Sequence, residues 1–202
     1  MEITERILKG AEELFMRYGF KTMTMDDVAK HLSISKKTIY LHFKDKNALV
    51  ESVMENHMQF EQSAIIEIRK ESANAIEELY KVSKFMKTMM MDMNPSVVID
   101  LQKYHPKAWK YFSDHKHECI TKNILDNLNW GVTEGFYRKD LNCEILALLR
   151  VEQIVMGFNP SIFPSSKFTV LEVQMELLNH FVSGIVSKEG QKLYNDYIQN
   201  NG

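Results

Sequence analysis

The sequence is poor in cysteine and proline, and it has no long apolar run. Its two cysteines, Cys119 and Cys143, form no CxxC pair, which argues against a disulfide-stabilised scaffold. No segment approaches the roughly 18 consecutive apolar residues that a membrane-spanning helix needs. The opening residues, MEITERILKG, carry acids and a periodic pattern that a secretory signal does not have. We therefore expect a chain that works in the reducing cytoplasm and does not enter a membrane.

Charge of one sign is not in large excess either, because the net charge is -2. The distribution is uneven, however. Residues 1–50 carry nine Lys/Arg against seven Asp/Glu, and the remainder carries sixteen against twenty. The segment from residue 28 to residue 50 has one acid, Asp45, and five lysines, namely Lys30, Lys36, Lys37, Lys44 and Lys46. A compact basic segment on an otherwise acidic chain can attract phosphate groups locally.

The sequence has only 4 prolines and 8 glycines. In the long stretches between them, apolar residues recur three and four positions apart. This period predicts an all-α protein. The first helix is expected over 3–18, the second from Thr24, a third after Ser35, and a long fourth helix from Asp45 to about Lys70. Further helices are expected near 74–93, 96–104, 106–131, 141–158 and 168–187, with a short one after Glu189.

Two capping signals mark a helix-turn-helix near the N-terminus. Thr24 is placed to accept the N–H of Asp27, an acid in the first turn of the second helix. Ser35 can cap the third helix in the same way, and Ile34 and Ile39 have the spacing of a hydrophobic staple. Two short capped helices joined by a turn of about three residues are typical of this motif.

The faces of the third helix suit a DNA groove. With about 100° between successive residues, Ile39 and Phe43 point together toward the first two helices. Lys37, Thr38 and Leu41 fall on the opposite side, where they can reach a guanine edge, a base of either type and a thymine methyl group. On the flanks of this helix, Tyr40 is placed to hold a phosphate, as is Lys46 just beyond it. The alternative is an ordinary basic, solvated face of a helical bundle.

The segment ILKGAEELFMRYGFKTMTMDDVAKHLSISKKTIYLHFKDKNALVESV resembles the DNA-binding domain of TetR-family transcriptional regulators. The resemblance covers about the first 53 residues. It rests on AxxLFxxxGF at the end of the first helix, TMDDVA at the start of the second, and KTIYLHFKDK through the third into the fourth. The later residues resemble the family only in size and helicity.

The resemblance implies an N-terminal three-helix DNA-binding domain, residues 1–46, followed by a larger helical effector-binding and dimerisation domain, residues 47–202. It implies a homodimer that binds palindromic double-stranded operator DNA and is released by a small-molecule effector, with repression the commoner mode. The residues expected to approach bases are Lys36, Lys37, Thr38 and Leu41. Those expected to hold phosphates are Thr24, Tyr40, His42 and Lys46, and Ser35 at the start of the third helix completes the DNA-binding set.

Two properties of the later helices bear on regulation. The segments 141–158 and 168–187 each carry a broad apolar stripe that suits a four-helix dimer interface, although both stripes could instead face the subunit's own core. Sixteen of the 21 aromatic residues lie after residue 50, and five of the 13 methionines fall between 86 and 93, which suggests an apolar or aromatic effector. The alternative is that these residues only pack in the core. The residues chosen to line its pocket are Phe85, Met86, Met89, Met90, Trp109, Phe112 and Trp130.

Three other functions remain as alternatives. The HKHEC segment, residues 115–119, suggests a metal sensor, but His115 and Cys119 share a helix face that His117 does not. A helical-bundle enzyme has no phosphate loop, GxSxG or HExxH motif in its favour. An architectural DNA binder would not need so large a C-terminal region. We therefore expect no catalytic site, no metal and no cofactor.

Overall fold

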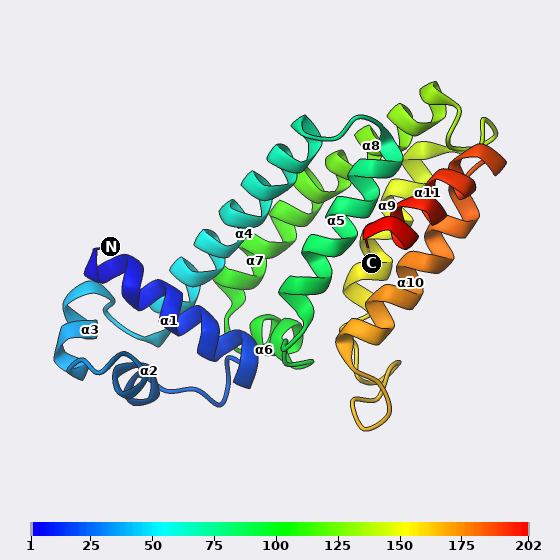
Figure 1. Cartoon of the computed structure of the whole chain (residues 1–202). Helices are drawn as coiled ribbons and strands as arrows, with labels where there is room; N and C mark the ends of the chain where they lie inside the picture. The colour runs from blue at the N-terminus through cyan, green and yellow to red at the C-terminus, as the bar shows by residue number, and fades with distance from the viewer. Residues whose placement is uncertain (1, 202) are drawn as a thin grey trace.

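The computed structural model describes residues 2–201, and in this range it contains helices and one isolated bridge between Tyr137 and Val186 (Figure 1). The helices are α1 (Ile3–Tyr18), α2 (Met25–Leu32), α3 (Lys36–His42), α4 (Lys46–Lys70), α5 (Ala75–Met90), α6 (Val97–Tyr104), α7 (Pro106–His115), the π-helical segment η1 (Lys116–Ile120), α8 (Thr121–Glu134), α9 (Cys143–Met156), α10 (Val170–Ile185) and α11 (Lys188–Asn201). The all-α prediction is confirmed. Along the described chain, no helix has both the length and the apolar character needed to cross a bilayer.

The N-terminal helices form a compact unit at one end of the molecule. Figure 1 shows α1, α2 and α3 gathered beside the first half of α4. A continuous apolar cluster joins these elements, with Ile7, Phe15, Val28, Ile39 and Leu49 fully shielded from solvent. The predicted starts and ends of α1 and α4 agree with the structure.

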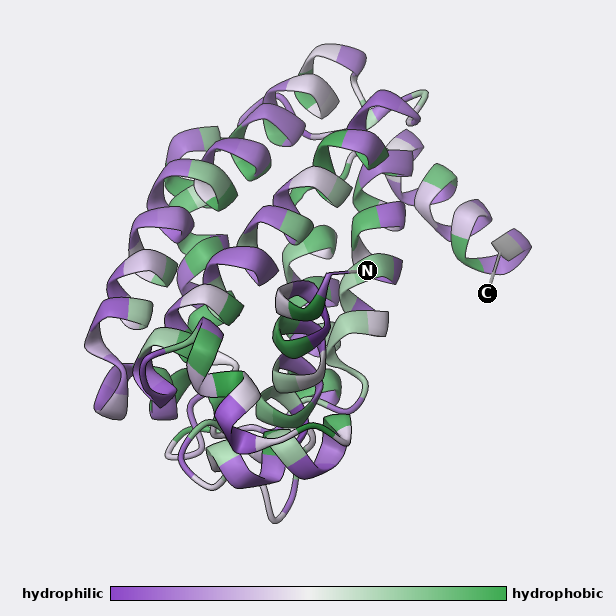
Figure 2. Cartoon of the chain, turned by 90° about the vertical axis from the view of Figure 1, so that its left-hand side faces the viewer, coloured by the Kyte–Doolittle hydropathy of each residue, from purple (hydrophilic) through white to green (hydrophobic). Residues whose placement is uncertain are grey.

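The remaining helices form a bundle with a second apolar cluster. This cluster draws on α5, α8, α9, α10 and α11, and the side chain of Tyr137 is buried at its centre. Figure 2 shows hydrophilic and hydrophobic positions alternating along the helices of the chain, as packing by one face of each helix requires. Smaller boundary differences aside, the predicted helix over 106–131 is divided in the structure. The π-helical turn η1 separates α7 from α8 and widens the helix locally, a change that apolar spacing does not reveal.

The N-terminal unit is fastened to α6 at the end of α1. Gly19 has a φ of 87°, and a Cβ there would lie 2.8 Å from the Ser96 hydroxyl oxygen, so glycine is needed both for the conformation and for the close approach. The buried carboxylate of Asp100 accepts the backbone N–H of Lys21 at 2.9 Å. A backbone bond of 2.7 Å from Asn94 to the Met16 carbonyl completes the attachment.

A buried ionic triad ties α1 to α4. His57 of α4 is 3% exposed; its Nδ1 donates to the Glu12 carboxylate of α1 at 2.6 Å, and its Nε2 lies 3.3 Å from the Glu61 carboxylate. Burial by itself lowers the pKa of His57, but the hydrogen bonds and charges of Glu12 and Glu61 outweigh it and raise the pKa to about 10. His57 is therefore a charged imidazolium at neutral pH. His115 of α7 also interacts electrostatically with His57 and Glu61 of this triad.

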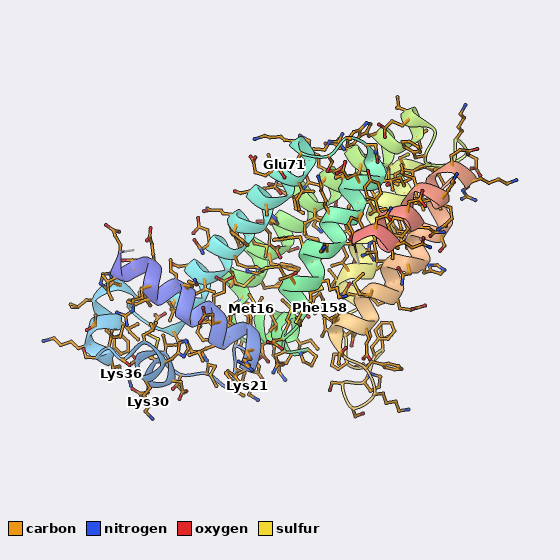
Figure 3. All side chains as sticks on the ribbon, in the orientation of Figure 1. Met16, Lys21, Lys30, Lys36, Glu71 and Phe158 are labelled. Atoms are coloured by element: carbon orange, nitrogen blue, oxygen red, sulfur yellow. The ribbon has the colours of Figure 1, made fainter. Side chains whose placement is uncertain are left out.

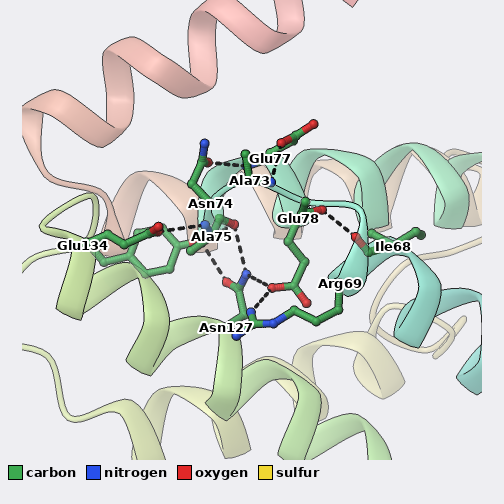
Figure 4. A network of polar contacts seen from close by, with 11 residues as sticks. Ile68, Arg69, Ala73, Asn74, Ala75, Glu77, Glu78, Asn127 and Glu134 are labelled. Atoms are coloured by element: carbon green, nitrogen blue, oxygen red, sulfur yellow. Dashed lines mark hydrogen bonds and ion pairs between the residues drawn. The ribbon is translucent and has the colours of Figure 1, made fainter.

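The far end of α4 is held by a second polar network (Figure 4). Arg69 near the end of α4 forms an ion pair with the buried Glu78 of α5. The Asn127 side-chain amide on α8 donates to the Glu78 carboxylate at 2.7 Å and to the Ala75 carbonyl at 3.0 Å. The middle of α4 and its C-terminal end are thus fixed to different neighbours, and the helix is unbroken between them.

Replacing His57 with Gln is expected to lower the free energy of unfolding by roughly 3–5 kcal/mol near pH 6, because it removes one partner of a buried charged group. The pKa of His57 is raised on folding, from 6.5 to about 10. The stabilising contribution is therefore complete below about pH 6.5 and is lost as the pH rises through about 10. Urea unfolding of both proteins across this range should show the difference shrinking with rising pH.

The matched control is His31→Gln, since His31 is an exposed histidine that lies 3.3 Å from Glu13. This variant should change stability little at any pH in the series. A His57→Gln deficit of the same size at both ends of the range would show that the imidazolium is not what stabilises the junction.

Candidate DNA-binding surface and internal cavity

The turn between α2 and α3 forms as the capping residues predict. The Thr24 hydroxyl accepts the Asp27 N–H at 3.2 Å, and the Asp27 carboxylate accepts the Thr24 N–H at 2.9 Å, so the start of α2 is a reciprocal capping box. Ser33 closes α2 in the left-handed conformation, with a φ of 53°. The Ser35 hydroxyl then caps α3 by accepting the Thr38 N–H at 3.0 Å.

The two faces of α3 are arranged as predicted. Ile39 is fully buried and Phe43, just beyond the helix, is 6% exposed. On the opposite side Leu41 is 75% exposed, and Lys37 is exposed beside it. Leu41 and Lys37 therefore lie together on the solvent side of this seven-residue helix, where an aliphatic group and an ammonium can reach base edges in a major groove.

Other residues of the predicted DNA-binding set have partners within the chain. The Lys36 ammonium donates to the Asp26 carboxylate of α2 at 2.9 Å, between two largely exposed side chains. The Thr38 and Ser35 hydroxyls are 2.8 Å apart. His42 Nδ1 is hydrogen-bonded to the Thr4 hydroxyl of α1 at 2.9 Å. These contacts are exposed, so each can be exchanged for a contact with DNA at small cost.

The basic side chains of this unit lie at its outer edge. Figure 3 labels Lys30 and Lys36, which lie on the α2 and α3 side of the unit, away from the bundle. Tyr40 is 45% exposed on the same short helix as Lys36. Lysines around an exposed tyrosine give a surface that can hold phosphate groups.

Lys46 differs from this pattern. Its ammonium donates to the Phe20 carbonyl at 2.5 Å and to the Lys21 carbonyl at 3.4 Å. Burial lowers the pKa of Lys46, while the charges of Asp100 and Asp27 oppose that effect. The lysine therefore secures the loop after α1, an arrangement that the sequence alone did not suggest.

The bundle encloses a cavity among α4, α5, α8, α9 and α10. Its volume, measured as the space open to the centre of a water-sized sphere, is about 180 Å³. A single water needs only about 10–15 Å³ by this measure, so the cavity has room for an organic molecule. Most of its lining is apolar, including Ile65, Leu79, Val82, Ile124 and Leu178.

The structure assigns only part of the predicted pocket set to this cavity. Met86 and Met90 line it, and Trp130 lines a second, more open hollow beside Arg69. Trp109 and Phe112 pack against the N-terminal apolar cluster, and they stack on each other with ring centres 5.5 Å apart. Phe85 packs against Phe60 at 6.1 Å. Neither Phe85 nor Met89 is among the residues that line the cavity.

Sequence reasoning missed the charged or titratable residues of the cavity, which are Glu61, Glu78, Lys87, His115 and Arg150. A signal for Arg150 was present, because it falls within the inner stripe of α9 formed by Ala147, Val151 and Ile154. A single arginine on an apolar helix face has to be explained by a partner or a ligand. Among residues 2–201, no group of three or more His, Cys, Asp or Glu side chains is arranged to hold a metal ion.

Comparison with known protein families gives a match in the region of the predicted DNA-binding domain. The family model described as "Bacterial regulatory proteins, tetR family" matches residues 7–53. This range contains α2 and α3 entirely and reaches into α4. The match therefore covers the surface described above and leaves the cavity outside it.

Relatives extend the similarity over most of the chain. The HTH-type transcriptional regulator YvaF of Bacillus subtilis is 24% identical over 92% of this chain and 96% of its own length. The HTH-type transcriptional repressor KstR2 of Mycobacterium tuberculosis is 22% identical over 69% of this chain and 72% of its own.

Solved structures share the fold over nearly the whole chain. A TetR-family regulator from Agrobacterium tumefaciens superposes with a TM-score of 0.75 at 15% identity, covering 91% of this chain and 97% of that one. The KstR2 structure superposes with a TM-score of 0.62 at 20% identity, covering 93% and 96%. These findings show that the chain carries, at residues 7–53, the DNA-binding domain of the tetR family of bacterial regulatory proteins, and that nearly the whole chain has the fold of TetR-family transcriptional regulators.

Proposed function

We propose that this protein is a ligand-responsive repressor that binds palindromic operator DNA as a homodimer and is released by a small molecule in its cavity. The observation that carries the proposal is the exposed face of α3, where Lys37 and Leu41 project away from a core closed by Ile39 and Phe43. KstR2, with which the chain shares its fold, is itself described as a repressor. Residues 1–46 would bind DNA and residues 47–202 would bind the effector and the second subunit.

The proposed contacts follow from exposure and chemistry. Lys37, Thr38 and Leu41 would meet base edges in the major groove, with Lys36 joining them once it leaves Asp26. Thr24, at the N-terminus of α2, and Tyr40 would hold phosphates. Ser35 and His42 border this surface and are the remaining residues of the proposed DNA-binding set. Lys46 is left out because its ammonium is bound to two backbone carbonyls.

Dimerisation is proposed to use the outer face of α9. Ile145, Leu148 and Leu149 are 61%, 53% and 48% exposed, although the helix otherwise packs into the bundle. The apolar stripe predicted on α10 packs within its own subunit, since Val173, Leu178 and Phe181 are buried there. A contact through α10 would therefore use its exposed positions; one of these is Gly184, where an added Cβ meets no atom within 4 Å.

Helix α4 is proposed to carry the signal from the cavity to the DNA. Its first half supplies Val53 and Met58 to the N-terminal apolar cluster, and from Glu61 onward its side chains line the cavity. An effector that prefers a different tilt of α4 would shift the spacing of the two recognition helices, which must lie roughly 34–36 Å apart to meet successive major grooves.

The test of this function is selection of bound duplexes from a random pool by the intact protein. A palindromic sequence with a fixed half-site spacing is the expected result. Recovery of duplexes without a shared sequence, or with a single unpaired half-site, would contradict a dimeric operator binder.

Lys37→Ala is expected to weaken binding to the selected operator by about 1–3 kcal/mol, because a lost base contact costs this much. Binding to a scrambled duplex should change much less. Lys192→Ala, on α11 at the far end of the chain, is the charge-matched control. Equal losses on the operator and the scrambled duplex, measured by fluorescence anisotropy, would show that Lys37 contacts phosphate instead.

Leu148→Glu is expected to convert the protein to a monomer, because it places a charge in the proposed α9 interface. Operator affinity should fall on the order of 100-fold, since two linked half-site contacts become one. Ile198→Glu, at a similarly exposed aliphatic residue on α11, should leave both properties unchanged. If light scattering shows that Leu148→Glu is still a dimer, the dimer interface does not use this face of α9.

A further inference from the structure

Arg150 is a buried cation without a counter-ion. The residue is 8% exposed and lines the cavity from α9, and its Nη1 has no hydrogen-bond partner. No carboxylate lies within ion-pairing distance of it among the described residues. Burial lowers the pKa of the guanidinium to about 10, which leaves it charged at neutral pH.

The acidic groups of the cavity are already occupied. Glu61 is paired with the His57 imidazolium, and Glu78 is paired with Arg69 and hydrogen-bonded to Asn127. The nearest described partner of the Arg150 guanidinium is the ring of Phe181, whose centre lies 5.7 Å from Cζ. Among the described residues, Arg150 is therefore the buried positive charge of the cavity that the chain itself does not neutralise; Lys87, which also lines the cavity, is exposed to solvent.

An uncompensated buried charge is costly, and a protein gains by neutralising it. A water molecule can satisfy a single N–H but cannot neutralise a guanidinium. A carboxylate can do both, because its two oxygens match the paired N–H groups of arginine. The remaining lining, which includes Leu79, Val82 and Ile154, suits an apolar body attached to that carboxylate.

We propose that the effector is an amphipathic monocarboxylate whose head group binds Arg150 and whose apolar body fills the cavity toward Met86 and Met90. This inference rests on the proposed function, because it names the chemical class of the proposed effector. It also refines the expectation drawn from composition, which suggested an apolar or aromatic effector, by adding a charged head group. The buried, unpaired guanidinium of Arg150 favours an effector with a negatively charged head group.

The experiment compares ligands that share an apolar body and differ in the head group. Decanoate, decanol and decylamine form one series, and naphthoate with naphthalenemethanol forms a second. Calorimetric titration into the intact protein without DNA should show a carboxylate that binds about tenfold or more tightly than its alcohol, as a charge-assisted hydrogen bond predicts. Decylamine should bind most weakly of its series.

The key variant is Arg150→Met, which keeps an unbranched apolar side chain of similar length. It should abolish the preference for carboxylate over alcohol while binding of the alcohol persists. Two control variants should retain the preference. Lys87→Met removes an exposed cation at the edge of the cavity. Gln153→Leu removes another buried polar group of α9, because the Gln153 Oε1 also has no hydrogen-bond partner.

The melting temperature gives a second readout. Without ligand, Arg150→Met should melt at a higher temperature than the original protein, because the uncompensated charge is removed. Decanoate should raise the melting temperature of the original protein more than that of the variant.

Four outcomes would overturn the proposal: an alcohol that binds as tightly as its carboxylate, a preference retained in Arg150→Met, a lower melting temperature for that variant, or no binding by either carboxylate. Operator binding is measured separately on the ligand-free protein. Absence of the head-group preference in the original protein, with intact operator binding, would reject only the effector class. Absence of operator binding would instead reject the proposed function.

Discussion

Helix α4 is a single rigid element shared by the two halves of the molecule, and this continuity is the constraint on which the rest depends. At 1.5 Å per residue its 25 residues span roughly 37 Å. One part of the helix is packed into the core beneath the recognition helix, and the next part lines the cavity. No flexible linker separates the two sites along α4. A displacement of α4 at the cavity therefore moves the N-terminal unit as well, unless the helix itself is strained.

The attachments of the N-terminal unit determine how such a displacement is transmitted. The end of α1 is joined to α6 through Asp100, and the middle of α1 is joined to α4 through His57. Because Glu61 both lines the cavity and pairs with His57, the cavity lies one side chain away from the junction. A ligand therefore does not need to act over a long distance to reach the contact between α1 and α4.

Two buried cations in this protein differ in whether the chain supplies a negative partner. His57 is enclosed by two carboxylates from different positions, and the triad helps to hold the fold together. Arg150 has no such partner and opens onto an empty space lined by apolar side chains. The first arrangement is complete within the chain, and the second becomes complete only when a negative group enters. Burial alone does not distinguish a structural charge from a ligand-binding one; the presence or absence of a partner does.

Local sequence determined the N-terminal unit almost to the residue, because caps and apolar spacing act within a few positions: Thr24 and Ser35 cap their helices, and Ile39 and Phe43 are buried as predicted. Only the tertiary structure could place Lys46 on the Phe20 carbonyl, or separate Trp109 from the cavity that Met86 lines. The cavity is built by helices far apart in the chain, whose relative rotation depends on packing. Periodicity identifies the inner face of each helix but not which neighbour it meets, so the unpaired charge of Arg150 could be recognised only after the bundle was assembled.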